Sequence, residues 1–161
     1  MRTLLILALA AGVTALTLGS MGCGSSGGTD SASGESAVPK ALYVQKGDRI
    51  CQANYAKRTR LLVNLRKQFA NGTKLPTQAD QEQILVNQIM PIFWEESKEL
   101  NALPPPGEGA EEAKEILAAL ERSIEGVEAD PAKSLSAGTG VEFKEAEQLA
   151  HEYGFKWCGR S

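Results

Sequence analysis

From about residue 41 onward, apolar side chains recur at intervals of three and four, and no segment alternates convincingly with a period of two. Spacings of three and four place apolar side chains on one face of an α-helix, whereas strands require the two-residue period. The pattern therefore argues against a sheet and predicts an all-α domain. In such a domain amphipathic helices bury their apolar faces against one another.

The first predicted helix covers about 41–71 and ends at Asn71-Gly72. Gly47 weakens its early part by about 1 kcal/mol relative to alanine, so a later start with Asp48 as the N-cap is an alternative. Its inner face follows the helical period, with Cys51 and Leu62 beside the stripe. The inner residues are expected to be Tyr43, Ile50, Asn54, Leu61, Leu65 and Phe69.

The second predicted helix begins at Thr77, an N-cap with Asp80 three residues later. Pro91 lies in its middle and should kink it, because proline lacks the N–H that an internal helical bond needs. The segment "LPPPGEG" ends it, since residues before proline avoid the helical region. Its inner face is expected to comprise Leu85, Ile89, Ile92 and Leu103.

Two further helices follow. One is predicted at 110–129, after which Asp130 caps a short helical turn that begins with Pro131. The last is "VEFKEAEQLAHEY", which Gly154 ends. The inner face of the 110–129 helix is expected to comprise Ala113, Leu117, Leu120, Ile124 and Val127.

Four amphipathic helices with short connections predict an antiparallel four-helix bundle with up-down-up-down topology, its second helix kinked at Pro91. In this topology the start of the first helix and the end of the fourth lie at the same end of the bundle. Cys51 and Cys158 occupy those positions and can meet. A disulfide between them would close a loop of about a hundred residues and contribute about 4–5 kcal/mol in the chain-entropy model.

The N-terminus has the order of a secretory signal peptide. Arg2 gives a basic start, the run 4–18 is almost wholly apolar, and small residues follow. This run is shorter than the roughly 20 residues that span a bilayer, which favours a signal peptide over a retained anchor. The sequence therefore predicts an exported protein.

Cys23 is predicted to be the acylated cysteine of a bacterial lipoprotein, although the preceding "SMG" is an imperfect recognition box. Three cysteines in an oxidising compartment would leave a spare thiol, whereas lipid on Cys23 leaves Cys51 and Cys158 as a pair. A Gly/Ser-rich flexible stretch follows. The predicted organisation is a signal peptide at 1–22, the lipidated cysteine and tether at 23–39, and a helical domain at 40–161, held on the outer face of the cell membrane.

Three motifs resemble a group of small exported lipoproteins from actinobacterial genomes. They are "GDRICQAN" early in the first helix, "LPPPGE" after the second, and "EYGFKWCG" at the end of the fourth. In that group the same two cysteines bracket a helical domain. The resemblance implies the fold, the extracytoplasmic compartment and the Cys51–Cys158 bond, and it implies no catalytic activity.

A single histidine, His151, restricts the catalytic and metal-binding schemes open to the domain. Glu147 lies one turn before it, but di-iron bundles need two Glu-x-x-His pairs and this chain offers "QLAH" once. Disulfide-bonded cysteines supply no thiolate, and the acidic clusters at 95–99 and 111–115 lack the ligand pattern of a calcium hand. We expect no catalytic residue, metal or cofactor. The alternative is an envelope hydrolase or metal-dependent enzyme that uses His151 and nearby carboxylates.

Charge is distributed unevenly along the domain. Residues 40–74 carry nine basic residues and one acidic residue, whereas 75–161 carry seven basic and 17 acidic residues. One explanation is pairing between helices; the other is contact with anionic lipid headgroups or wall polymer phosphates, and nucleic acid is not an expected partner outside the cell. The residues expected to make the anionic contact are Lys57, Arg58, Arg60, Arg66 and Lys67.

Aromatic residues give the last candidate site. A kink at Pro91 can open a groove between helices, and Phe93, Trp94 and Trp157 are its candidate lining, although such residues more often belong to the core. The sequence thus favours a lipid-anchored binding or interaction module of the cell envelope with an unidentified ligand or protein partner. A carrier of an apolar molecule is a further alternative.

Overall fold

The computed structural model describes residues 37–72 and 75–160. The predicted signal peptide, Cys23 and the tether up to residue 36 lie outside these residues. Within the described part the regular structure is helical and no β-strand forms, so the all-α prediction is confirmed. An isolated bridge joins Val38 to Pro106, and the backbone N–H of Gly107 donates to the Val38 carbonyl at 2.9 Å. This bridge ties the beginning of the domain to the loop between two later helices.

The first helix, α1, spans Lys40–Asn71 without interruption. Gly47 lies inside it because the Phe155 ring packs so closely that a Cβ there would lie 2.6 Å from the ring's Cε1 atom. The alternative start at Asp48 is therefore wrong. The Asp48 carboxylate instead accepts hydrogen bonds from the backbone N–H groups of Lys156 and Trp157 in the C-terminal tail, at 2.9 and 2.8 Å.

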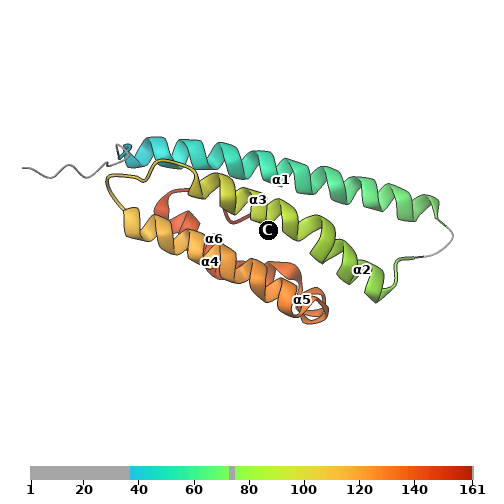
Figure 1. The fold of residues 1–161 in the computed structure, drawn as a ribbon. Coiled ribbons are helices and arrows are strands. Elements are labelled where there is room, and N and C mark those ends of the chain that lie inside the picture. The colour runs from blue at the N-terminus through green and yellow to red at the C-terminus, as the bar shows by residue number, and fades with distance from the viewer. Residues whose placement is uncertain (1–36, 73–74, 161) are drawn as a thin grey trace, which may run out of the picture. The chain divides into compact units, whose positions relative to one another are not determined.

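The second helical rod has three parts, α2 (Gln78–Ile84), a π-helical turn η1 (Leu85–Ile89) and α3 (Met90–Asn101), and it returns beside α1 (Figure 1). Thr77 and Asp80 form the predicted cap, with both reciprocal hydrogen bonds of a capping box. Pro91 lies in the first turn of α3, where its missing N–H costs little. The backbone hydrogen bonds therefore change from the α to the π pattern just before Pro91, and the helix continues past the proline.

The π turn changes which side chains face inward. The Met90 N–H donates to the carbonyl of Leu85, five residues earlier, so one extra residue is accommodated in this turn. An α-helical spacing predicts Leu85, Ile89 and Ile92 as the inner face. The structure buries Leu85, Met90 and Phe93 instead, because the register moves by one residue after the π turn.

The remaining helices are α4 (Ala110–Ala129), α5 (Pro131–Ala137), the 3-10 turn η2 (Thr139–Val141) and α6 (Lys144–Tyr153). The bounds of α4 agree with the prediction, and the Asp130 carboxylate caps α5 by accepting from the Lys133 N–H at 2.9 Å. Gly154 ends α6 in the left-handed conformation, as predicted. The last helix begins later than expected, because Val141 belongs to η2 and a turn at 142–143 precedes α6.

Helix packing joins α1 to α3, α3 to α4, and α4 to α6, while α5 packs on α2 and α4 (Figure 1). The predicted disulfide between Cys51 and Cys158 is confirmed. It links α1 to the tail after α6, and Gly159 in that tail packs against the backbone of Glu147 on α6. The tail is therefore held from both sides.

The buried face of α1 differs from the predicted stripe. It consists of Tyr43, Gly47, Cys51, Asn54 and Arg58, and no α1 residue after Arg58 is buried. The predicted residues of the second half are only partly buried. The segments opposite this half are the short helices α2 and α5 and the turn η2, which leave an apolar part of α1 incompletely covered.

Candidate ligand-binding groove

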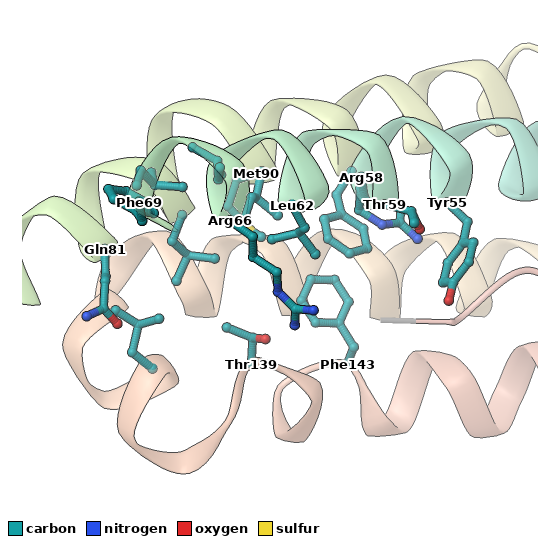
Figure 2. A pocket seen from close by; sticks show the side chains of 16 residues that line it. Tyr55, Arg58, Thr59, Leu62, Arg66, Phe69, Gln81, Met90, Thr139 and Phe143 are labelled. Carbon is teal, nitrogen blue, oxygen red and sulfur yellow. The ribbon is translucent and has the colours of Figure 1, made fainter. Parts of the chain in front are cut away.

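A cavity of about 440 Å³ opens beside the second half of α1, between that helix, the α2–η1–α3 rod and the α5–η2 segment (Figure 2). The α1 residues that line it begin at Tyr55 and end at Phe69. They recur at intervals of three and four, so they share one helix face. The groove therefore follows α1 for about 21 Å at a rise of about 1.5 Å per residue.

The opposite wall is built by the π turn. Leu85 and Ile89 line the groove from this turn, Met90 follows at the start of α3, and Leu135 closes the groove from α5. In a regular α-helix Met90 and Phe93 would not both face this side together with Leu85. The unusual turn thus creates the apolar wall, in keeping with the frequent occurrence of π turns at functional sites.

The inner end of the groove contains a buried ion pair. Arg58, 6 % exposed, donates from Nη1 to Glu96, 2 % exposed, over 2.7 Å. Its Nη2 donates to the backbone carbonyl of Arg160 at 2.7 Å, and its guanidinium lies 3.9 Å from the centre of the Phe93 ring. Burial raises the pKa of the Glu96 carboxyl above its ordinary value, the Arg58 charge opposes this rise, and Glu99 adds to it.

The mouth of the groove carries one basic and one apolar side chain, because Arg66 and Leu62 both line the groove and are both exposed. Figure 2 shows the Arg66 side chain extending across the groove toward Thr139 and Phe143. Gln81 lines the distal end. Among the described residues, no ion pair or hydrogen bond is made by the Arg66 guanidinium. Its positive charge is therefore available to a molecule in the groove.

The three predicted groove aromatics do not meet in one site. Phe93 lines the groove and stacks on Phe143, with ring centroids 4.4 Å apart. The Trp94 indole N–H donates to Glu128 on α4 at 3.0 Å, outside the groove. Trp157 packs on Tyr55, with centroids 5.8 Å apart, and lies outside the lining as well.

The five predicted surface cations divide into two groups. Lys57 and Arg58 pair with Glu95 and Glu96 of α3, and Arg58 lies in the interior. Arg60, Arg66 and Lys67 are exposed. Pairing between helices thus accounts for part of the positive charge of α1, and three exposed cations remain on its second half.

His151 is exposed on α6 and borders a shallow hollow with Lys144, Glu147 and the tail residue Gly159. Over residues 37–72 and 75–160, no three side chains of the His, Cys, Asp or Glu types gather as metal ligands. None of the helices in the same ranges combines the length and apolar character needed to cross a bilayer. A catalytic or metal-binding mechanism in this hollow would have His151 as its single histidine.

Several residues that line the groove carry no clear signal in the sequence. Leu135 and Thr139 come from the short segments between the two last predicted helices, Phe143 lies near the start of the last one, and Gln81 reads as an ordinary exposed position. The one available signal was the apolar stripe of the first helix, which continues to Phe69, beyond its buried part. No family model, curated protein or solved structure matches this chain. Its function is therefore inferred from the groove residues themselves.

Proposed function

We propose that the domain is a binding module of the cell envelope and that its ligand is an apolar molecule held in the groove beside the second half of α1. The observation that carries this proposal is a cavity of about 440 Å³ with largely apolar walls. Small-molecule sites in proteins are typically concave and apolar, with volumes of about 300–1,000 Å³ and a few polar groups. The groove has each of these properties.

The walls of the groove are supported before any ligand binds. Phe93 and Phe143 are buried and stacked, and Arg58 is fixed by Glu96 and the Arg160 carbonyl. A preformed site avoids much of the entropy cost of ordering side chains on binding. In contrast, Leu62 at the mouth is 45 % exposed, so an apolar ligand would remove it from water.

The test uses two neighbouring apolar residues of α1. Leu62 lines the groove, whereas Val63 does not, and they are 45 % and 42 % exposed. We expect the neutral fluorescent probe N-phenyl-1-naphthylamine to bind the wild-type domain and to bind Leu62→Gln about fivefold more weakly, since about 1 kcal/mol of apolar contact is lost. Fluorescence titration of purified protein measures the dissociation constants.

The control is Val63→Gln, which makes the same kind of change outside the groove and should bind the probe as the wild type does. Glutamine is a good helix former, so neither substitution should disturb α1. Equal weakening by both variants, or an absence of probe binding to the wild type, would contradict the proposed site.

We further propose that the domain is tethered to the outer face of the cell membrane through lipidated Cys23. We also propose that its helices form an antiparallel four-helix bundle with up-down-up-down topology, its second helix kinked at Pro91. The basis for the anchor is the order of basic, apolar and small residues before Cys23 and the pairing of the other two cysteines. The motif resemblance to small actinobacterial lipoproteins supports the same location. The exposed cations Arg60, Arg66 and Lys67 would then lie within reach of anionic lipid or wall polymer.

The anchor is tested by the intact mass of the protein extracted from native membranes. We expect a chain that begins at Cys23, carries added diacylglycerol, and lacks two hydrogens because of the disulfide. Cys23→Ser should abolish the lipid mass and release the protein from the membrane fraction. A wild-type chain that is unmodified and cut at another position would exclude the lipoprotein assignment.

A further inference from the structure

We infer that the groove binds a long-chain carboxylate, with Arg66 at the mouth contacting the carboxylate and the apolar walls holding the chain. This inference rests on the proposed function, because it names the class of ligand for the same groove. It adds a residue that recognises the head group and a charge that the ligand must carry.

The charges that line the groove favour an anion. Two of the 16 lining residues are arginines and none is acidic. Arg58 is already neutralised by Glu96 at 2.7 Å, whereas no acidic side chain pairs with Arg66 among the described residues. A ligand with a negative head group would complement the Arg66 charge, and a cationic amphiphile would be repelled by it.

One guanidinium at the mouth matches a monoanion. Arginine binds a carboxylate through two parallel N–H···O bonds, and such charge-assisted bonds are stronger than neutral ones. A phosphate monoester carries a charge of about −1.5 to −2 at neutral pH and would need further cations for balance. Thr139, which Figure 2 places near the Arg66 side chain, adds a hydroxyl and no charge.

The dimensions of the groove favour one chain. Its α1 wall extends from Tyr55 to Phe69, a length of about 21 Å. At the inner end the rings of Phe93 and Phe143 stack on each other, with centroids 4.4 Å apart, and close the groove. An elongated cavity of about 440 Å³ suits a single acyl chain better than the paired chains of a membrane phospholipid.

The experiment compares ligands that share a chain of sixteen carbons and differ in the head group. Hexadecanoate, hexadecan-1-ol and hexadecyl phosphate compete with N-phenyl-1-naphthylamine for the wild-type domain at pH 7.5. We expect hexadecanoate to bind about tenfold more tightly than the alcohol, owing to the charge-assisted bonds with Arg66. Arg66→Gln should reduce the ratio of the dissociation constants for the alcohol and for hexadecanoate from about ten to about one.

Lys67→Gln is the matched control, because Lys67 is the next residue, is exposed and does not line the groove. It removes the same charge from α1 and should retain the tenfold preference, and matching thermal melts would establish that both variants are folded. Equal affinity for hexadecanoate and the alcohol, an equal loss in the two variants, or tighter binding of hexadecyl phosphate would overturn the carboxylate assignment alone. Failure of the neutral probe and of every amphiphile to bind would overturn both this inference and the proposed function.

Discussion

At the scale of single residues, the Arg58–Glu96 pair is the most unusual feature of the domain. Both side chains are almost fully buried, and their charges meet at 2.7 Å beside the Phe93 ring. Transferring two charges from water to the interior is costly, and their attraction often fails to repay that cost. Arg58 also holds the Arg160 carbonyl, so the pair specifies where the C-terminal tail lies.

The raised pKa of Glu96 makes stability depend on pH in a defined direction. Burial raises the pKa of this carboxyl above its ordinary value of 4.5, so between 4.5 and the raised value the folded state binds more protons than the unfolded state. The contribution of Glu96 to stability is complete below pH 4.5 and is lost as the pH rises through that window. Glu96→Gln, which resembles the protonated form, should therefore be at least as stable as the wild type at pH 7, and the two free energies of unfolding should converge toward pH 4.

Urea denaturation of both proteins at intervals between pH 4 and pH 7 measures this difference. Glu95→Gln is the matched control, because Glu95 is the preceding residue and pairs with Lys57 at the surface. Its substitution should cost at most about 1 kcal/mol. A Glu96→Gln variant that becomes progressively less stable than the wild type as the pH rises would mean that the ion pair stabilises the fold.

At the scale of the elements, short capping motifs in the sequence predicted where helices begin and end better than apolar spacing predicted which side of a helix is buried. The Thr77 cap, the Asp130 cap and the Gly154 stop are confirmed because each depends on residues within a few positions of one another. The inner face of the second rod was predicted one residue out of register after Leu85. The π turn at 85–89 has no sequence signature of its own beyond the nearby proline.

The buried ion pair escaped prediction for a different reason, whereas the buried Asn54 was correctly placed on the inner face of the first helix. Arg58 and Glu96 are 38 positions apart, and each reads as a solvated charge on its own helix. Only the packing of α1 on α3 brings them together. The groove was predicted near the aromatic residues that follow Pro91, and one of these, Phe93, does line it. Its other walls come from α1, η1, α5 and η2, whose convergence depends on tertiary packing.

At the scale of the whole domain, the C-terminal tail connects otherwise separate parts. Asp48 accepts hydrogen bonds from two tail N–H groups, Cys51 binds Cys158 covalently, and Arg58 holds the Arg160 carbonyl. These three contacts are spaced along one face of α1. The tail therefore covers part of the face that lies N-terminal to the groove, and its position is coupled to the inner end of the groove through Arg58.

The disulfide is expected to supply a large share of the stability of this arrangement. Its sulfurs join residues 107 positions apart, so opening it would stabilise the unfolded chain by about 5 kcal/mol through its larger conformational entropy. Cys51→Ala/Cys158→Ala should lower the free energy of unfolding by about that amount, as measured by urea denaturation.

Cys23→Ser in the full chain provides the control and should leave the denaturation midpoint unchanged, because the bonded pair remains intact. The double variant should also bind the neutral probe more weakly, since a released tail removes the Arg160 carbonyl that fixes Arg58 beside Phe93. An unchanged midpoint in the double variant would mean that helix packing alone holds the tail. Weaker binding of the probe by the double variant, measured while it remains folded, would show that the tail helps to shape the groove.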